Sequence, residues 1–424
     1  MSQEKKQWGA IIVMIALFAM IAFVTNLCSP MAIIVKNDFG ASNVLAQIGN
    51  IGNFIAYLIM GIPAGILIAK FGYKKTALIG LAIGIIGVLI QWMSGHVGRE
   101  IAFLVYLIGA FVSGLTMCIL NCVVNPMLNQ LGGGGNKGNQ LIQIGGVFNS
   151  GAAVAVYIIM GALIGDAAKA HIADATPALM IALAIFVVAF IVILFTKIEE
   201  PEQAPVDISL LKGAMQYRHF VLGTLAIFLY MGIEVGTPTY MLQYLTSTPI
   251  GDATEPMAAS IAGLIAAVYW LMMLAGRFLG GIIGGKISSR AMITTVSTLS
   301  ILLVLFGMFA PTTSTINVPG IDWANLSVIW SEVPVGIFAF ILVGLCTSVM
   351  WGGIFNMAVE GLGRYTAIAS GIFMTMVFGC AVMVPLQGWV ADLTGNYLTS
   401  YWVVVACAAY VLFYALIGSR VAKK

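Results

Sequence analysis

The stretch KIEEPEQAPVDISLLKGAMQYRH, from Lys197 to His219, separates two apolar halves of the sequence. It is rich in acidic side chains and holds two prolines, whereas long apolar stretches flank it on both sides. A polar segment with proline between such stretches is typical of a linker. We therefore divide the chain into residues 1–197, a linker at 198–217, and residues 218–424.

The composition indicates that lipid, and not water, surrounds most of the chain. The residues AVILMFWYC fill 61% of 424 positions and only 8% of positions are charged, whereas soluble domains carry about 25% charged residues. A helix needs about 20 apolar residues to cross a bilayer. Twelve stretches meet this length, at residues 8–35, 43–69, 75–95, 101–129, 139–165, 175–197, 218–246, 256–286, 290–310, 334–360, 365–391 and 396–420. The predicted fold is an all-α integral membrane protein with twelve transmembrane helices in two six-helix bundles.

The basic residues predict how these helices are oriented. With a cytoplasmic amino terminus, 16 of the 19 Lys and Arg residues fall on the cytoplasmic side, and Lys36, Arg99 and Lys169 lie outside. Cytoplasmic loops of membrane proteins carry the excess of positive charge. We therefore expect both termini in the cytoplasm.

An internal repeat relates the two halves. The segment GIPAGILIAKFGYKK follows the second predicted helix, and RFLGGIIGGKISSR follows the eighth. At a constant offset of 216, three residues of the first coincide with residues of like type in the second: Gly65 with Gly281, Lys70 with Lys286, and Lys74 with Arg290. Parallel six-helix repeats are a transporter architecture, with the substrate site near mid-membrane where the halves meet.

The glycine and basic pattern after the second helix resembles the cytoplasmic loop motif of the major facilitator superfamily. Longer strings are similar to the fucose:proton symporter family, especially its glucose/galactose porter branch: NPMLNQLG, FNSGA, LYMGIEVGTPTYMLQYL, GRFLGG and EGLGRYTAIASGIFMTMVFGCAVMVPLQGWVAD. The resemblance covers the whole chain. It implies uptake of a monosaccharide or a close derivative across the inner membrane. Our leading hypothesis is a secondary transporter for a neutral hexose or related sugar that works by alternating access, coupled to protons or sodium.

One acidic residue is expected deep in the membrane. Glu234 lies 16 residues into the seventh predicted helix, within FLYMGIEVGTPTY. An ionised side chain at mid-bilayer is costly and faces a cavity or a partner. The resembling family carries a glutamate in the same context. We interpret Glu234 as the coupling residue, and a protonated glutamate that serves packing is the alternative.

The second predicted helix carries a polar stripe. Gln47, Asn50, Asn53 and Tyr57 follow steps of three, three and four residues and therefore share one face. Such a stripe faces either a cavity or the polar groups of another helix, and both interpretations stay open. Asn53 is a candidate substrate ligand.

Asparagines in other helices are further candidate sugar ligands, because an amide offers both donors and an acceptor to sugar hydroxyls. They are Asn26 in helix one, Asn121 in helix four, Asn149 in helix five and Asn356 in helix ten. Contacts between helices are the competing role.

An aromatic ring can cover the apolar face of a sugar. Tyr269, Trp270 and Trp351 are deep enough in the second half, and Trp351 is the preferred platform, with packing as the alternative. Arg277 is expected near the cytoplasmic end of helix eight, where it would reach the interface or cap carbonyls. No predicted span then carries a basic residue at mid-depth, which favours a neutral substrate.

Two acids of the fucose:proton symporter family are missing. The position matched to Asn121 carries a carboxylate there, and the acidic position of its first helix has no counterpart in VTNLCSPMAIIVK. Proton coupling, sodium coupling and facilitated exchange therefore stay open. Rival functions are a transporter of a sugar acid, peptide or drug, a passive channel, and a membrane-embedded enzyme.

Other chemistry is not indicated. The run of glycines at 132–135 is followed by Asn136 and Lys137 and lacks the GxxxxGK[ST] pattern of a phosphate loop. The six cysteines lie in predicted helices, at spacings that suggest neither a metal site nor a disulfide framework. We expect no cofactor, no metal, no catalytic residue, no nucleic-acid partner, and a monomer in the lipid bilayer.

Overall fold

The computed structural model describes residues 7–27, 30–31, 34–35, 38, 40, 48–132, 135–164, 170–198, 209–251, 253–283, 287–322, 327–362 and 365–421. Its first half contains α1 (Trp8–Asn26), α4 (Ile48–Ser94), α5 (Arg99–Leu131), α6 (Gly135–Ile164), η1 (Ile172–Ala175) and α7 (Thr176–Phe195). Its second half contains α8 (Ser209–Ala214), α9 (Arg218–Ser247), α10 (Ala259–Ile283), α11 (Ser289–Phe309), β1 (Thr315–Asp322), β2 (Ser327–Pro334), α12 (Val335–Thr347), α13 (Met350–Val359), α14 (Thr366–Thr375), η3 (Met376–Phe378), α15 (Gly379–Thr394), η4 (Thr399–Tyr401), α16 (Trp402–Phe413) and η5 (Tyr414–Gly418).

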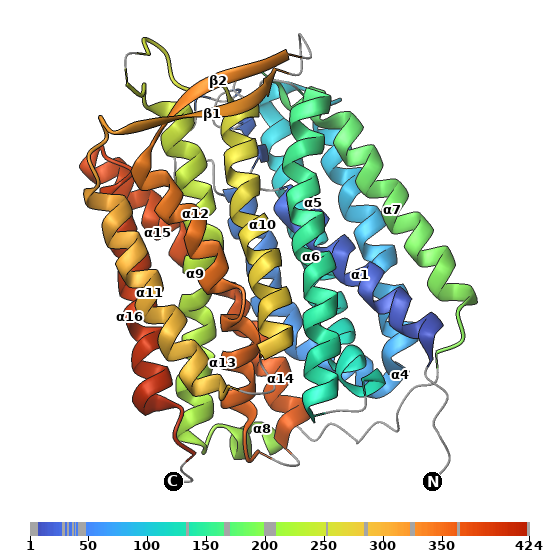
Figure 1. Ribbon diagram of the computed structural model, residues 1–424. Helices are drawn as coiled ribbons and strands as arrows, with labels where there is room; N and C mark the ends of the chain where they lie inside the picture. Colours follow the sequence, from blue (N-terminus) through green and yellow to red (C-terminus); the bar gives the residue numbers. More distant parts are fainter. Residues whose placement is uncertain are drawn as a thin grey trace.

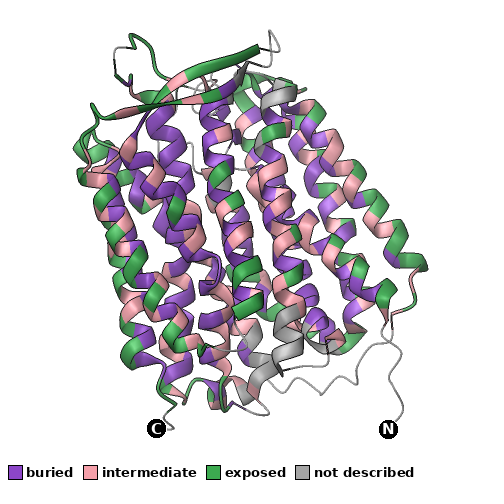
Figure 2. Cartoon of the chain, viewed as in Figure 1, coloured by how far each residue is buried: buried purple, intermediate pink, exposed green. Residues whose placement is uncertain are grey.

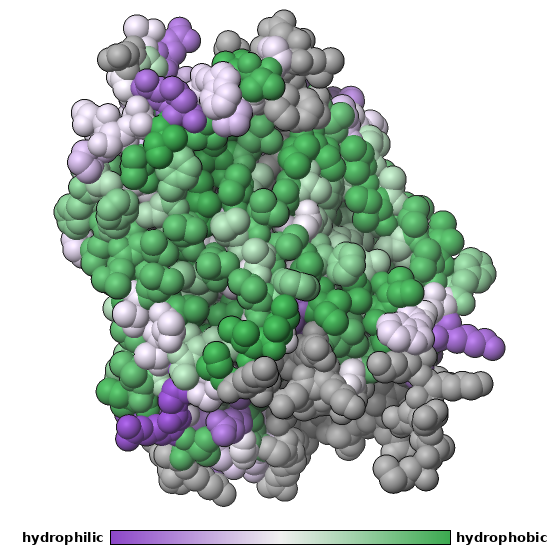
Figure 3. Space-filling view, in the orientation of Figure 1, coloured by the Kyte–Doolittle hydropathy of each residue, from purple (hydrophilic) through white to green (hydrophobic). Residues whose placement is uncertain are grey.

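Twelve helical segments of the described chain are long and apolar enough to cross a membrane, as predicted. They are Trp8–Asn26, Ile51–Ile68, Lys70–Ser94, Arg99–Leu128, Leu141–Met160, Ile172–Phe195, Arg218–Ser247, Ile261–Ile283, Ser289–Phe309, Val335–Val359, Gly371–Thr394 and Thr399–Gly418. Apolar side chains form a broad belt across the middle of the molecule, with polar side chains towards its two ends (Figure 3). Exposed residues recur along the outer helices, such as α7 and α11, whereas α9 and α12 are buried along most of their length (Figure 2).

The two ends of the described chain lie on one side of the molecule, where α1 begins and α16 ends (Figure 1). We call this the termini side. The strands β1 and β2 cover the opposite side, which we call the hairpin side (Figure 1). The first six spans end at Phe195 and the seventh begins at Arg218, and the short helix α8 lies between them.

The second and third spans are joined by a sharp reversal within α4. Gly72 has a φ of 80° there, a conformation that strains any residue with a Cβ atom. Just after the turn, the Lys74 Nζ donates to the carbonyl oxygens of Leu194 and Thr196, at 3.1 and 2.8 Å. A cation is favourable at these unpaired carbonyls because the end of a helix carries partial negative charge. The contact fixes the end of the sixth span against the third.

The second half repeats this arrangement at the residue that the sequence repeat pairs with Lys74. The Arg290 Nε, at the start of the ninth span, donates to the Ser419 Oγ at 3.2 Å, just after the twelfth span. In both halves a basic residue at the start of the third helix therefore binds the end of the sixth. The offset of 216 thus pairs Lys74 with Arg290, which make the same contact in the two halves.

The twelve-helix fold is as predicted, and between the ninth and tenth spans the structure adds a short β-hairpin that was not predicted. The strands β1 and β2 pair antiparallel, from Thr315 opposite Pro334 to Asp322 opposite Ser327. The hairpin is buried where β2 leads into α12, since Val333 is fully buried there. The strand β1 also contacts α10. Further along β2, the consecutive residues Val328, Ile329 and Trp330 are all exposed.

The two halves meet along helix pairs that include α6 with α10, and α4 with α14 and α15. Small residues allow close approach at these contacts. A Cβ atom added at Gly61 of α4 would lie 2.3 Å from the Thr375 Oγ1 of α14 and 3.1 Å from its Cα. The α6–α10 contact contains the polar site described next.

Candidate substrate and coupling site

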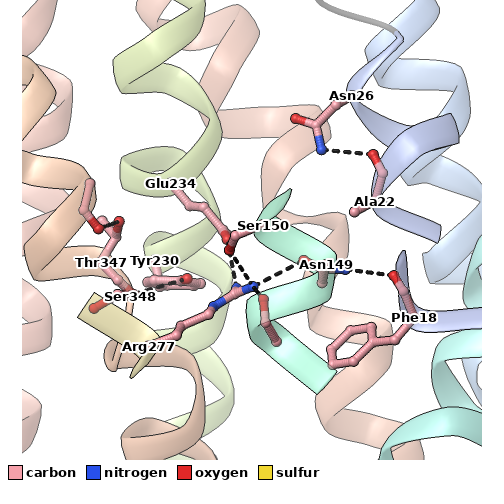
Figure 4. Close-up of polar contacts among 12 residues, drawn as sticks. Phe18, Ala22, Asn26, Asn149, Ser150, Tyr230, Glu234, Arg277, Thr347 and Ser348 are labelled. Atoms are coloured by element: carbon pink, nitrogen blue, oxygen red, sulfur yellow. Dashed lines mark hydrogen bonds and ion pairs between the residues drawn. The ribbon is translucent and has the colours of Figure 1, made fainter. Parts of the chain in front are cut away.

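An ion pair joins α9 and α10 in the interior of the protein (Figure 4). The Arg277 Nη2 lies 3.7 Å from the Glu234 Oε1, and the two side chains are only 10% and 12% exposed. Glu234 sits near the middle of the 30-residue helix α9. Each charge would be costly to bury alone, and each compensates the other.

The guanidinium of Arg277 also reaches across to the first half of the chain. Its Nη1 donates to the Gly146 carbonyl at 2.9 Å, the Asn149 Oδ1 at 3.0 Å and the Ser150 Oγ at 2.9 Å. All three acceptors belong to α6 (Figure 4). The prediction that Arg277 extends to the membrane interface is therefore wrong, whereas the alternative that it binds neighbouring carbonyls holds for Gly146. Arg277 bends inward because a buried carboxylate and three acceptors are within its reach.

Asn149 extends this network to the first helix. Its Nδ2 donates to the Phe18 carbonyl of α1 at 2.9 Å, while its Oδ1 accepts from Arg277. A continuous chain of polar contacts therefore runs from α1 through α6 and α10 to α9 (Figure 4). An amide can join these partners because it donates and accepts at once.

Two tyrosines support the backbone behind the ion pair. The Tyr269 hydroxyl donates to the Glu234 carbonyl at 3.0 Å and lies 3.2 Å from the Thr347 Oγ1. The Tyr230 hydroxyl, one turn before Glu234, donates to the Thr347 carbonyl at 3.3 Å. These contacts fix α9 and α10 against α12 and so hold Glu234 in place. Thr347 was not identified from the sequence, since nothing local marks it.

The contact between α6 and α10 is made by a stripe of residues that we call the α6–α10 seam: Gly146, Asn149, Ser150 and Gly151 on α6, and Leu274, Arg277 and Gly281 on α10. Trp270 lies on the same face of α10, because it precedes Arg277 by seven residues, or about two turns. Its ring is buried, and its Nε1–H has no hydrogen-bond partner within the described chain. A buried donor of this kind is available to a ligand.

The candidate amides of helices two and four lie together within the first half. The Asn121 Nδ2 donates to the Tyr57 hydroxyl at 2.8 Å, and the Asn125 Nδ2 donates to the Asn121 carbonyl at 3.0 Å. Asn53 is buried in α4, where its backbone carbonyl oxygen is close to Gly114 of α5. Of the two roles considered for the polar residues, Tyr57 and Asn121 have that of a contact between helices. Gln47 and the side chain of Asn50 fall outside the described residues.

Trp351, the preferred aromatic platform, belongs to a cluster of rings in the second half. Its ring centroid lies 6.2 Å from that of Tyr230 and 5.8 Å from that of Phe373. Asn356 follows five residues later and points about 140° away around the helix. Trp351 and Asn356 therefore do not form one surface. On α1, the Asn26 Nδ2 donates to the Ala22 carbonyl of its own helix at 2.8 Å.

A second ionic cluster lies near the hairpin-side ends of the first-half spans. Asp38 Oδ1 is 2.8 Å from His171 Nδ1 and 3.7 Å from the Arg99 Nη2, and Asp38 Oδ2 accepts from the Ile172 amide at 3.1 Å. Burial alone would raise the pKa of Asp38, but the hydrogen bonds from His171 and Ile172 and the nearby positive charges lower it overall. The hydrogen bond to Asp38, together with its charge, raises the pKa of His171.

The sign of each shift fixes the pH window of this cluster. A raised histidine pKa gives stability that is fully present below the ordinary histidine value and is lost as the pH rises through the raised value. A lowered aspartate pKa gives stability that is present above the ordinary aspartate value and is lost as the pH falls through the lowered value. The contact between Asp38 and His171 is therefore strongest between these two limits.

Within the described residues, no group of three or more His, Cys, Asp or Glu side chains could hold a metal ion. Five cysteines there are buried and are not in disulfide bonds: Cys118, Cys122, Cys346, Cys380 and Cys407.

The twelve apolar helices are those of a membrane protein, and the family and relatives that the chain matches are membrane transporters and not enzymes. The sequence pattern of the Major Facilitator Superfamily matches residues 13–378, and the chain belongs to this family. It is 29% identical over 427 residues to a glucose/galactose transporter of Brucella abortus biovar 1 (strain 9-941), covering 99% of this chain and 96% of the relative.

Two further matches extend over nearly the full chain. An L-fucose-proton symporter of Escherichia coli (strain K12) is 22% identical over 435 residues, covering 96% of this chain and 92% of that one. A crystal structure of the transporter FucP in the outward conformation superimposes with a TM-score of 0.71 at 20% identity, covering 96% and 97% of the two chains. This structural match shows that the fold is the same.

Proposed function

We propose that the protein is a secondary transporter that takes up a neutral hexose or a related monosaccharide across the inner membrane by alternating access. We further propose that uptake is coupled to protons through Glu234, with both termini in the cytoplasm. The relatives named for glucose, galactose and fucose match along nearly all of the chain, which supports a sugar as the substrate.

The ion pair between Glu234 and Arg277 carries this proposal. Both charges belong to the second half, but Arg277 is bonded to α6 of the first half. Alternating access requires the two halves to move against each other around a site near mid-membrane. A proton that binds the Glu234 carboxylate removes the counter-charge of Arg277 at the contact that has to move. Proton binding and movement of the halves are thereby linked.

The same pair supports a neutral substrate. A buried arginine would attract a sugar acid if its charge were uncompensated. Glu234 lies 3.7 Å from Arg277 and balances its charge, so the site has no excess of positive charge for an anion. The sequence argument for a neutral substrate assumed that no span carries a buried basic residue, and Arg277 contradicts this assumption because it is buried. The neutral substrate is now supported by the balance between the charges of Glu234 and Arg277.

We propose that Asn149 and Trp270 contact the sugar. Asn149 lies on the α6–α10 seam, and Trp270 is on the helix face that forms it, with a buried N–H that has no partner in the described chain. The aromatic ring suits the apolar face of a sugar and the N–H suits a hydroxyl. Other candidate ligands are Asn26, Asn53, Asn121, Trp351 and Asn356. Of these, Asn121 is bonded to Tyr57 within the first half, whereas the bonds of Asn149 include one to the second half, and Trp351 is packed against other rings.

Reconstituted protein tests the proposal directly. Proteoliposomes are loaded with an unlabelled monosaccharide, and entry of the same labelled sugar is followed with no gradient, with an inward proton gradient, or with an inward sodium gradient. We expect saturable counterflow of at least one neutral hexose, and net accumulation only with the proton gradient. Accumulation driven by sodium alone would refute proton coupling, and no saturable flux of any neutral monosaccharide would refute the sugar assignment.

A further inference from the structure

Arg277 connects the second half of the chain to α6 by hydrogen bonds. Its Nη1 reaches three acceptors on two successive turns of that helix, at Gly146, Asn149 and Ser150. A Cβ atom added at Gly146 would lie 3.1 Å from the Arg277 Cδ, so the glycine leaves room for the arginine stem. The helix α6 is therefore shaped to receive this side chain.

The sequence repeat shows that this contact is particular to one seam. At the offset of 216 that relates the halves, Arg277 corresponds to Gly61. Gly61 also lies where the halves meet, but there it packs against Thr375 of α14 and brings no charge. The two related positions thus differ in chemistry. One contact is close packing alone, and the other is a charged side chain with hydrogen bonds to the opposite half.

The contact of Arg277 with α6 depends on the negative charge of Glu234, which lies in the same half of the chain as Arg277. Glu234 is the carboxylate paired with the guanidinium, and Tyr230 on α9 is a further titratable side chain beside that carboxylate. The nearby Tyr269 hydroxyl bonds the Glu234 carbonyl and not its carboxylate. The three acceptors on α6 are neutral. Without the negative charge of Glu234, the buried guanidinium has no charge to balance it.

We propose that Arg277 is a latch between the two halves, which is closed while Glu234 is charged and is released when Glu234 is neutral. Opening the α6–α10 seam breaks the three hydrogen bonds of Arg277 to α6, and the free guanidinium then needs solvent or another partner. Arg277 therefore acts as a positioning residue that turns the charge of Glu234 into a movement of the halves. This inference rests on the proposed alternating-access function.

A disulfide across the seam can report whether it is closed. A Cβ atom at Gly281 of α10 would lie 3.9 Å from the Gln143 Cβ of α6. Disulfides join residues whose Cβ atoms are about 3.5–4.5 Å apart. The double variant Gln143→Cys/Gly281→Cys should therefore cross-link when the seam is closed. The described native cysteines are buried and do not compete readily for the oxidant.

The experiment measures the initial rate of oxidative cross-linking of this cysteine pair in membranes, in four backgrounds. They are the unchanged chain, Arg277→Gln, Glu234→Gln, and Arg420→Gln as the control at an exposed arginine. We expect the rate to fall at least about fivefold in the first two variants, the low end of typical coupling between sites. The control should retain the rate of the unchanged chain. A rate in Arg277→Gln equal to that of the control would overturn the latch, and an unchanged rate in Glu234→Gln would overturn its dependence on charge.

A second variant guards against misfolding. Arg277→Lys keeps the charge but has a single ammonium in place of the forked guanidinium, so we expect a rate between those of the unchanged chain and Arg277→Gln. Thermal unfolding of each variant shows whether it is folded. No sugar is present in these measurements, so their result does not depend on the substrate assignment. If sugar uptake is found while the cross-linking rates are unchanged, the latch alone fails.

Discussion

The ion pair between Glu234 and Arg277 should show up as a large coupling energy in a double-mutant cycle. Two unit charges 3.7 Å apart attract with about 4.5 kcal/mol at an effective dielectric constant of about 20. Both side chains are nearly inaccessible, so solvent screens this attraction little. Removing one partner of a buried pair typically costs about 3–5 kcal/mol, because the other charge is left uncompensated.

We therefore expect Glu234→Gln and Arg277→Gln each to lower the free energy of unfolding by about 4 kcal/mol. The double variant leaves no isolated charge and should lose less than the two single variants together, by about 3 kcal/mol. An unfolding entropy of about 2.1 cal/mol/K per residue makes a loss of 4 kcal/mol equal to a fall in Tm of about 4–5 °C for a chain of this length.

Thermal unfolding in detergent, followed by intrinsic tryptophan fluorescence, measures all four proteins under one condition. Arg420→Gln is the matched control, because it removes an exposed arginine outside the spans and should leave Tm unchanged. If the effects of the two single variants add to within about 0.5 kcal/mol in the double variant, the residues are energetically independent. The account of the site given above would then be wrong.

Three further outcomes test the proton, sugar and ionic sites. Glu234→Gln should keep sugar counterflow but lose accumulation driven by a proton gradient, and retained accumulation would remove Glu234 from coupling. Trp270→Phe should raise the KM for the sugar about 5- to 10-fold, because one hydrogen bond of about 1 kcal/mol or slightly more is lost; Trp351→Phe should change KM less, and the reverse order would refute the assignment. His171→Ala should lower Tm at about pH 5.5 and leave it unchanged at about pH 8.5, on either side of the ordinary histidine pKa, because its bond to Asp38 raises the pKa of His171; destabilisation at the alkaline pH alone would contradict this reasoning.

The spans could be predicted from the sequence because their signal is local and strong. A run of about 20 apolar residues has one stable form in lipid, a helix with all of its backbone hydrogen bonds made internally. The hairpin was missed because TINVPGID and SVIWSEVP lie in a polar segment between spans, where alternation over eight residues is a weak signal. Each strand is stabilised by pairing with the other strand, and the runs of apolar residues that predict the spans carry no information about this pairing.

Only one residue of the ion pair, Glu234, could be identified from the sequence. Glu234 was identified because an acid in an apolar run is conspicuous, whereas Arg277 was placed near a membrane edge. The predicted eighth helix ran to residue 286, and the described helix α10 ends at Ile283. The direction in which a long arginine side chain turns is decided by its partners, and these lie on α9 and α6, far away in the sequence. A buried acid without a visible partner was itself a signal that a base had to lie nearby.

The distribution of charge between the halves suggests how this chain differs from the fucose symporter pattern. Where that pattern has a carboxylate in the fourth helix, this chain has Asn121, which is bonded to Tyr57 within its own half. At the α6–α10 seam the acceptors that the first half offers to Arg277 within the described residues are a backbone carbonyl, an amide and a hydroxyl. These groups do not titrate at physiological pH, so on the proposed mechanism the first half binds without changing charge. The switch then resides in Glu234, and Arg277 transmits it to a helix whose acceptors are the same in both states. This division explains why an arginine, which can reach several acceptors at once, stands at the position that corresponds to Gly61 in the other half.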